Sequence, residues 1–376
     1  MPDRRHVCET LVSGFCGGAA RGAARPLRRG FNRQPPPLYG KAGREHESVA
    51  PNTSWNLRSS SERDTIGAEA HSQGSNRGPT GVQQGSAKER CFVRVISLGS
   101  GSSGNALVVR HGATTVLVDD GFAPRTLIAR LRAVGVAPEE VSAILLTHEH
   151  SDHTSGARAF ARRFGIPLIA DPRTLTALFA LPDRNAPGAP PPERVEMPIG
   201  HVLTWGTLEV TSFPVSHDAG APCGYLLASA AWRVLIATDT GMVTDAMLEA
   251  MRRANLLVIE ANHDYDRLVN GPYPHYLKAR ILSPKGHLSN EQTGRALVSV
   301  LDDGPRWLWL AHLSRTNNTP DIARAHIRAM LRQLGLRHIQ PHSLPHESGP
   351  TWDSAALWNT APESATKTEA TTAATE

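Results

Sequence analysis

A short run of polar residues directly after an apolar segment limits the possible folds of this chain more than any other feature. Residues 143–146 have the composition of a buried strand, and His148-Glu149-His150-Ser151-Asp152-His153 follows almost at once. Burying such groups without partners is unfavourable, by roughly 2–7 kcal/mol for a polar group alone. Three histidines and one aspartate so close together therefore indicate a metal site at the carboxyl end of a strand.

Polar residues follow several other apolar segments in the same way. Strands are expected at 92–98, 106–110, 115–118, 208–215, 224–228, 233–237, 256–260 and 307–310, and helices at 124–134, 157–164, 244–253, 290–301 and 320–334. The polar residues at or just past strand ends are Asp119, His217, Asp239, Glu260 and His312. Because the ends of adjacent strands converge on one rim, these side chains are expected to gather near the histidine run. The alternation of strands and helices predicts an α/β domain.

The two ends of the chain differ in composition from its middle. Residues 1–90 are rich in Arg, Gly, Ser and Pro without a sustained period, so we expect them to be disordered. They are either an organellar transit peptide or translated leader upstream of the true start. A folded domain is expected at 91–345 and a flexible tail at 346–376. The formal net charge of +5 comes mainly from the leader, so it says nothing about what the domain binds.

The cysteines and the hydropathy pattern indicate a cytoplasmic protein. Cys8, Cys16, Cys91 and Cys223 have no paired spacing, which favours a reducing compartment over a disulfide-linked secreted fold. No segment approaches the roughly 18–20 apolar residues of a membrane-spanning helix. A membrane partner is therefore not expected.

The spacing within the histidine run divides its ligands between two ions. His148 and His150 are two positions apart in an extended turn and can point to the same side. Asp152 and His153 come later, as the chain enters the next helix, and can serve a neighbouring ion. Nitrogen and oxygen ligands suit zinc, manganese or iron, and the absence of thiolates argues against a structural zinc site. An open site with water between two ions is the implied catalyst.

Seven segments, taken in order over about residues 92–340, resemble the metallo-β-lactamase-fold hydrolases, and in particular their YycJ-type or WalJ-like exonuclease branch. They are GSGSSGN (99–105), LVDDGF (117–122), PVSHDA (214–219), IATDTG (236–241), IEANHD (259–264), KGHLSNEQ (285–292) and AHLSRTNN (311–318). The resemblance implies a hydrolase domain that is a four-layer αββα sandwich, with two mixed sheets face to face and metals at one rim. The segment between Asp239 and His312 is too short for the cap domain of β-CASP relatives, so an open site is expected.

The resemblance also implies roles for the metal ligands. The residues expected to hold one ion are His148, His150 and His217, those expected to hold the other are Asp152, His153 and His312, and Asp239 is expected to bridge the two. Asp119 is expected to accept a hydrogen bond that fixes a ligand imidazole, or alternatively to turn the chain before Gly121.

The expected catalytic residues are Asp152, Glu260 and His287. The resemblance implies that His287, paired with Glu260, protonates the leaving oxygen, whereas packing at a helix entry is its alternative role. The residues expected to bind the substrate phosphate are Arg315, Ser314 and Asn317, with a solvated surface position as the alternative for Arg315. His263 and Asp264 either line the cleft or cap a turn. Residues 99–104 are expected to form a tight turn near the site.

These features predict a phosphodiesterase or exonuclease with two divalent ions, Zn²⁺ or Mn²⁺, in which a metal-bridging hydroxide attacks a nucleic acid, expected to be DNA. A thioester or lactam hydrolase of the same fold is one alternative, and it would not require the Glu260 and His287 pair. A non-catalytic metal-binding regulatory module is another, and the complete set of seven ligands argues against it.

Overall fold

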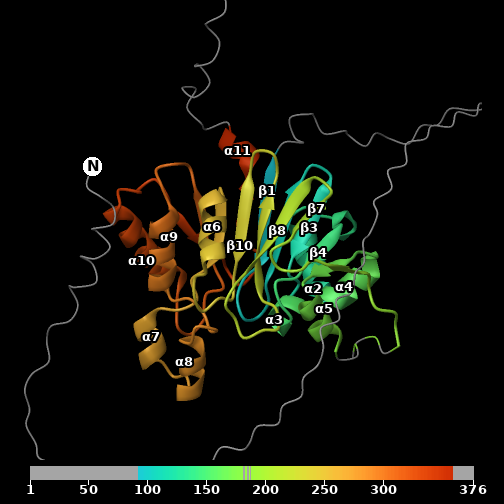
Figure 1. Cartoon of the computed structure of the whole chain (residues 1–376), viewed down its shortest axis with the longest axis horizontal. Helices are drawn as coiled ribbons and strands as arrows, with labels where there is room; N and C mark the ends of the chain where they lie inside the picture. The colour runs from blue at the N-terminus through green and yellow to red at the C-terminus, as the bar shows by residue number, and fades with distance from the viewer. Residues whose placement is uncertain (1–91, 181–182, 184–185, 187, 359–376) are drawn as a thin grey trace, which may run out of the picture. The chain divides into compact units, whose positions relative to one another are not determined.

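The computed structural model describes residues 92–180, 183, 186 and 188–358. The leader expected at residues 1–90 lies outside the described residues. Within them, two seven-stranded sheets pack face to face, with helices on both outer surfaces (Figure 1). The expected αββα sandwich is confirmed.

The first sheet combines antiparallel and parallel pairing. Its order is β14 (Thr351–Asp353), β1 (Val93–Gly99), β2 (Ala106–His111), β3 (Thr114–Val118), β4 (Ala143–Leu145), β5 (Leu168–Ala170) and β6 (Arg194–Glu196). Pairing is antiparallel from β14 to β3 and parallel from β3 to β6.

The second sheet repeats this arrangement. Its order is β13 (Pro341–Ser343), β12 (Trp307–Ala311), β11 (Leu256–Glu260), β10 (Arg233–Ala237), β9 (Cys223–Ala228), β8 (Leu208–Pro214) and β7 (Val202–Trp205). Pairing is antiparallel from β7 to β10 and parallel from β10 to β13. Each sheet therefore changes once from antiparallel to parallel pairing, at β3 and at β10.

Alternation along the strands produces three apolar layers. Val116 and Val118 of β3 point into the core between the sheets, whereas Leu117 faces the outer helices. Val234 and Ile236 of β10 likewise point inward, and the neighbouring Leu235 points outward. Because side chains alternate with a period of two, one apolar strand can contribute to two cores.

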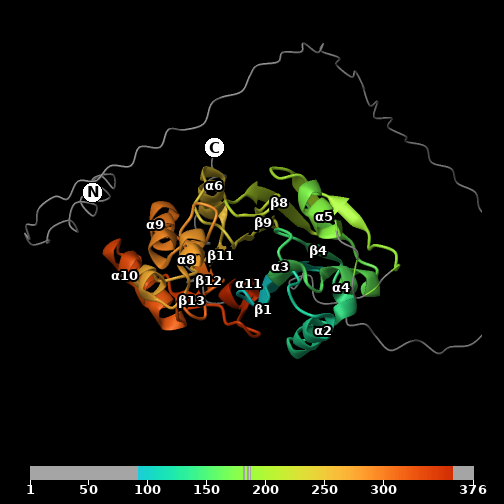
Figure 2. The same ribbon diagram turned by 90° about the horizontal axis from the view of Figure 1, so that it is seen from below.

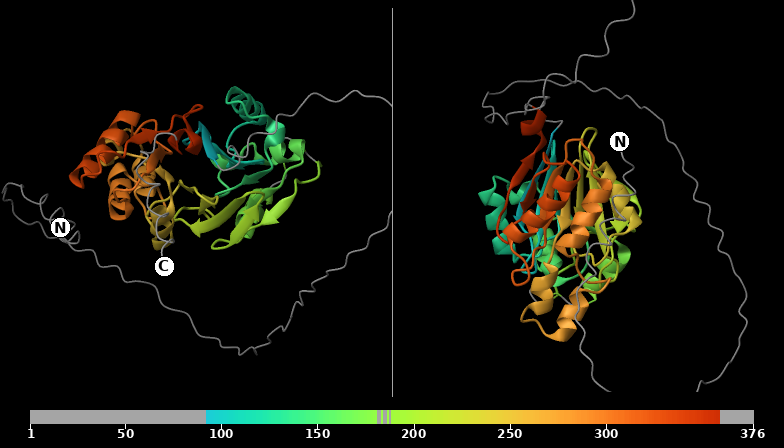
Figure 3. Two further views of the ribbon diagram at one scale, coloured as in Figure 1. Left: turned by 90° about the horizontal axis from the view of Figure 1, so that it is seen from above. Right: turned by 90° about the vertical axis from the view of Figure 1, so that its left-hand side faces the viewer.

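The outer helices belong to two groups. Those on the first sheet are α2 (Pro124–Ala133), α4 (Ala157–Phe164) and α5 (Pro172–Phe179), and those on the second are α6 (Asp245–Arg253), α9 (Asn290–Val300) and α10 (Pro320–Gln333). Figures 2 and 3 show the two groups on opposite outer faces of the sandwich. The remaining short helices are α3 (Ser151–Thr154), α7 (Tyr265–Asn270), α8 (His275–Ile281) and α11 (Ser354–Trp358). In α9, Ser289 and Gln292 form the reciprocal capping box that fixes where this helix begins.

The folded domain continues past the expected boundary at residue 345. β14 pairs with β1, Trp352 is buried in the core between the sheets, and the Val93 amide donates to the Ser354 hydroxyl. These contacts correct the boundary to at least Trp358. The sequence did not reveal it, because a three-residue strand is too short to show a periodicity. Among the described residues, no helix is long and apolar enough to cross a membrane.

Candidate metal centre

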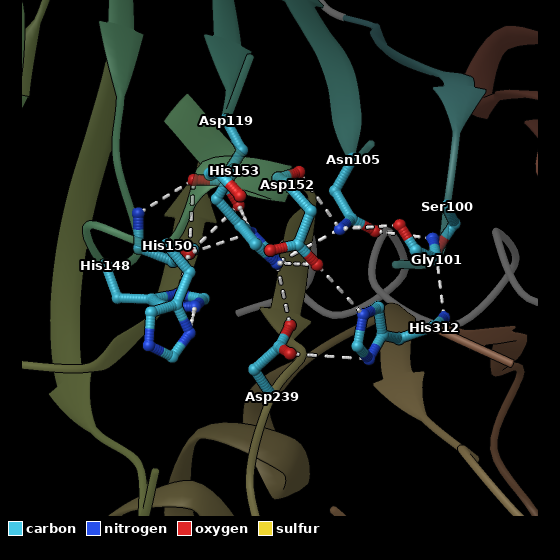
Figure 4. A network of polar contacts seen from close by, with 12 residues as sticks. Ser100, Gly101, Asn105, Asp119, His148, His150, Asp152, His153, Asp239 and His312 are labelled. Carbon is cyan, nitrogen blue, oxygen red and sulfur yellow. Dashed lines mark hydrogen bonds and ion pairs between the residues drawn. The ribbon is translucent and has the colours of Figure 1, made fainter. Parts of the chain in front are cut away.

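Three residues at strand ends have the left-handed backbone conformation. Among the described residues, the only non-glycine positions with positive φ are Asp119 (64°), Asp239 (54°) and His312 (54°). Asp119 follows β3, Asp239 follows β10 and His312 follows β12. This conformation is unfavourable for residues with a Cβ and is concentrated at functional sites. Here it turns the chain sharply as it leaves each strand, and the three side chains meet at one rim (Figure 4).

One group of ligand atoms comes from the histidine run and the loop after β8. His148, His150 and His217 each place one ring nitrogen within 4.8 Å of the others. Nε2 of His148 lies 3.1 Å from Nδ1 of His150, and the His217 ring centroid is 5.1 Å from both of the other rings. The structure thus brings together the three histidines expected at one ion.

The second expected group also converges. Asp152, His153 and His312 offer ligand atoms within 4.8 Å of one another. Asp152 Oδ2 lies 3.6 Å from His312 Nε2 and 3.8 Å from His153 Nε2. Asp239 lies between the two groups, because its carboxylate oxygens are 3.0 Å from His153 Nε2, 3.4 Å from His312 Nδ1 and 3.9 Å from His217 Nε2.

The buried carboxylates of this cluster favour bound positive charge. Burial alone would raise the pKa of Asp239, but the neighbouring imidazoles of His312 and His153 hold it well below its usual range. Conversely, burial opposes a charge on His312, yet the carboxylates of Asp239 and Asp152 raise its pKa to about 10. A carboxylate surrounded by histidines that take up protons is a site where divalent cations can replace those protons.

The donor atoms also fit metal ions. Nε2 of His312 is buried and makes no hydrogen bond, and Asp239 Oδ2 has no hydrogen bond despite its 3.0 Å approach to His153. Buried polar atoms normally have a partner. Nitrogen and carboxylate donors aimed at a shared space suit a divalent transition metal.

Asp119 holds the imidazole of His153 in place. Its carboxylate lies 2.7 Å from His153 Nδ1 and accepts from the backbone amide and the hydroxyl of Thr147. A hydrogen bond to Nδ1 leaves Nε2 of His153 facing Asp239. These contacts support the first of the two roles expected for Asp119.

Glu260 pairs with His287 beside the cluster. Glu260 Oε1 lies 2.8 Å from His287 Nδ1 and 2.9 Å from His312 Nδ1, while Oε2 accepts from the amides of Thr240 and Leu288. Burial opposes ionisation of Glu260, but the neighbouring His287 lowers its pKa to about 2. The His287 ring lies between those of His217 and His312, at centroid distances of 5.1 and 5.2 Å.

The three residues expected to bind phosphate differ in how exposed they are. Arg315 is exposed, and its guanidinium donates to the Ser103 hydroxyl in the loop that precedes β2. The Ser314 hydroxyl accepts from the Asn317 amide and closes a local turn. Asn317 is buried and its side chain faces the backbone at Gly271, so its assignment to the substrate stays a prediction. A spacing pattern could not distinguish these positions, because all three residues lie in one turn.

The neighbouring residues His263 and Asp264 differ in their hydrogen bonding. The Asp264 side chain accepts from the Arg267 amide and caps α7, which is the capping role considered for it. His263 is buried, neither ring nitrogen has a hydrogen-bond partner among the described residues, and burial lowers its pKa to about 4.

The glycine-rich loop at residues 99–105 contacts two of the expected ligands, His153 and His312. The Ser100 hydroxyl accepts from the His312 amide, and the Asn105 amide nitrogen lies 3.0 Å from His153 Nε2. The Asn105 carbonyl accepts from the Gly101 amide, which closes the tight turn expected at residues 99–104. Sequence reasoning identified this turn but not the contacts of Ser100 and Asn105, because Ser and Asn are common turn residues.

Comparisons with known proteins agree on one family. The family model described as "Beta-lactamase superfamily domain" matches residues 114–313. The chain is 37% identical to the exodeoxyribonuclease YycJ of Bacillus anthracis over 238 residues, which cover 63% of this chain and 89% of that protein. It is also 37% identical to the exodeoxyribonuclease WalJ of Streptococcus pneumoniae, over 64% of this chain and 88% of that protein. Among solved structures, the metallo-β-lactamase-fold protein YhfI of Bacillus subtilis matches with a TM-score of 0.52 at 17% identity, covering 70% of this chain and 99% of that one.

Proposed function

This chain belongs to the beta-lactamase superfamily and is a metal-dependent hydrolase, and we propose that it is an exodeoxyribonuclease that uses two divalent metal ions. The observation that carries the proposal is the contact of 2.8 Å between Glu260 and His287 beside the metal-ligand cluster. Hydrolysis of a phosphodiester releases a sugar oxygen, which is a poor leaving group until it is protonated. A histidine held by a buried carboxylate is suited to supply that proton.

The ligand set divides into two positions. His148, His150 and His217 would hold one ion, Asp152, His153 and His312 would hold the other, and Asp239 would contact both. When bound, such ions activate water as a nucleophile and stabilise negative charge on the phosphate. We propose Zn²⁺ or Mn²⁺, because nitrogen and oxygen donors predominate in both positions.

The chain's own residues orient the reacting groups. Asp119 fixes the ring of His153 by accepting from Nδ1. Glu260 binds Nδ1 of His287, which leaves Nε2 as the ring atom that can reach a leaving oxygen. Because Glu260 also contacts His312 Nδ1, one carboxylate orients both an expected ligand and the proton donor.

Two further features support DNA as the substrate and the cytoplasm as the location. The two relatives with 37% identity are named exodeoxyribonucleases, and the match covers most of their length. Cys223 is a free, buried thiol, as expected in a reducing compartment. Hydrolysis of a thioester or lactam, the alternative from the same fold, has less need of a proton donor such as His287.

The test is a comparison of substrates. Purified protein loaded with Zn²⁺ or Mn²⁺ is incubated with end-labelled single- and double-stranded DNA, with the matching RNA, and with a thioester and a β-lactam. We expect stepwise loss of nucleotides from DNA ends and little turnover of the other compounds. Turnover of the thioester or lactam without cleavage of DNA would contradict the proposal.

A further inference from the structure

Exposed aromatic and apolar side chains gather on the two short helices beside the metal centre. We call residues 264–285, which include α7 and α8, the helical lobe. Of the five tyrosines in the chain, three lie in this lobe: Tyr265, Tyr273 and Tyr276. Tyr265 is 56% exposed and Tyr276 is 77% exposed. Single exposed apolar residues are ordinary, but such a concentration in one short segment indicates a binding surface.

The lobe directly adjoins the metal centre. The Ser216 hydroxyl, next to His217, donates to the Pro284 carbonyl at 2.7 Å, and the His287 amide donates to the Ile281 carbonyl at 3.0 Å. Figure 1 shows α7 and α8 projecting beyond the sandwich at the end where α3 lies. A polymer whose end is held at the metal centre could therefore extend over the lobe.

The lobe carries a small excess of positive charge. It contains the cations Arg267, Lys278, Arg280 and Lys285, and its acids are Asp264 and Asp266. The Arg280 guanidinium binds Asp218 at 2.6 Å and is therefore neutralised. Lys285 is exposed, lies two positions before His287, and has no ion-pair partner among the described residues.

Polar contacts give the lobe its shape without using the tyrosine rings. The Lys278 ammonium donates to the Val269 carbonyl and ties α8 to α7, and Arg267 donates to the Thr316 carbonyl. At Gly271 an added Cβ would lie 2.4 Å from the Arg267 carbonyl oxygen, so the turn between the helices is tightly packed. In each helix only one residue is buried, Leu268 in α7 and Ile281 in α8. The exposed rings thus contribute little to the lobe's own stability.

We propose that the helical lobe binds the single-stranded end of DNA, with bases stacked on Tyr265 and Tyr276 and a backbone phosphate on Lys285. This inference rests on the proposed function, because it names the form of the substrate that the same centre receives. Stacking on a tyrosine ring accepts any base, and a nearby cation holds the backbone, which together are the recognised means of binding single strands without sequence preference. The bases of a duplex end are already stacked on one another, so a duplex gains less from exposed rings.

The experiment replaces the rings while keeping apolar surface. Tyr265→Leu/Tyr276→Leu removes both flat rings, and the matched control Tyr265→Phe/Tyr276→Phe keeps them. Binding of a fluorescent single-stranded DNA with phosphorothioate linkages, and of the corresponding blunt duplex, is measured by anisotropy on metal-loaded protein. We expect the leucine variant to raise Kd for the single strand by about tenfold or more, the phenylalanine variant to stay within about threefold, and duplex binding to change much less. Metal content and unfolding temperature confirm that each variant is folded.

A second variant tests the phosphate contact. Lys285→Gln should weaken single-strand binding and reduce the slope of log K against log salt by about one unit. Equal binding of single-stranded DNA by the leucine variant and the wild type would overturn the inference and would point to a protein partner for the lobe. Equal loss of binding for single strand and duplex would overturn it as well.

Activity measurements on the wild-type protein distinguish a failure of this inference from a failure of the proposed function. Cleavage of bis(4-nitrophenyl) phosphate, which is too small to span the lobe, reports on the metal centre alone. If the wild type cleaves this ester and DNA but single-strand binding is insensitive to the tyrosines, only the lobe assignment fails. If it cleaves neither, the proposed function fails.

Discussion

Asp239 lies between the two groups of expected metal ligands. Its carboxylate approaches His153, His312 and His217 from a left-handed backbone position that costs about 1 kcal/mol or more. Aspartate tolerates this conformation better than most residues. The same position therefore supplies both the sharp turn after β10 and the charge between the two groups of ligands.

We predict that Asp239→Asn loses both metal ions together. The amide keeps the size of the side chain and tolerates positive φ, but it removes the negative charge that a bridging ligand supplies. Metal content after loading and desalting, measured by elemental analysis, is the test. The control is Asp245→Asn, since Asp245 is exposed in the first turn of α6. Retention of one ion by Asp239→Asn would show that Asp239 serves only one position.

His287 should matter most where the leaving group is poor. We predict that His287→Ala keeps its metal and slows DNA hydrolysis by about 10²- to 10⁴-fold, the usual range for a general acid. A nitrophenyl diester needs that proton far less, so its turnover should fall only slightly. Glu260→Gln should show the same preference in milder form, because the amide still contacts His287. Equal losses on both substrates, or loss of metal, would make His287 a ligand or a packing residue.

Cys223 should be chemically inert in the folded protein. Burial raises the pKa of its thiol to about 12, and its Sγ lies against the Thr147 carbonyl. An unfolded thiol ionises near pH 9, so between pH 9 and 12 this group favours unfolding as the pH rises. We predict that a Cys8→Ser/Cys16→Ser/Cys91→Ser chain reacts with a thiol reagent at pH 8 only after denaturation. Rapid reaction of the native chain would show that this part of the core opens easily.

At the level of elements, the matched pairing of the two sheets explains why the ligands converge. Both sheets change from antiparallel to parallel pairing, at β3 in one and at β10 in the other. Asp119 directly follows β3, and Asp239 follows β10 after one intervening residue, Thr238. Because the sheets pack face to face, their strand ends open on one rim and each sheet delivers a carboxylate there.

The stability of the sandwich is expected to depend on β14. Ending the chain after residue 345 would remove the partner of β1, the buried Trp352 and the hydroxyl of Ser354 that accepts from Val93. Loss of a buried tryptophan alone costs about 3–5 kcal/mol. We predict a large fall in unfolding temperature for that chain and little change for a chain ending at Trp358. Equal stability of the two would mean that β14 is not needed for the sandwich.

For the molecule as a whole, the sequence predicted the alternation of strands and helices from local patterns, whereas the layered sandwich and the full ligand set were expected only from the resemblance to a known family. Continuous apolar runs such as β11 and amphipathic helices such as α10 give clear signals of their structure in the sequence. The helical lobe and β14 do not, since each contains few buried positions. The burial of Asn317 was equally hidden, because it depends on the distant turn at Gly271.

Residues 1–90 lie outside the described part of the chain, and the domain is not expected to need them. β1 begins at Val93 and already has β2 on one side and β14 on the other, so both of its edges are paired without any earlier residue. A segment rich in Arg, Gly, Ser and Pro has little apolar surface to add to the core. We therefore predict that a chain starting at Cys91 folds, binds the same amount of metal and cleaves DNA as fast as the full chain, measured by thermal unfolding, elemental analysis and turnover. Insoluble or inactive protein from that truncation would show that the leading segment belongs to the fold.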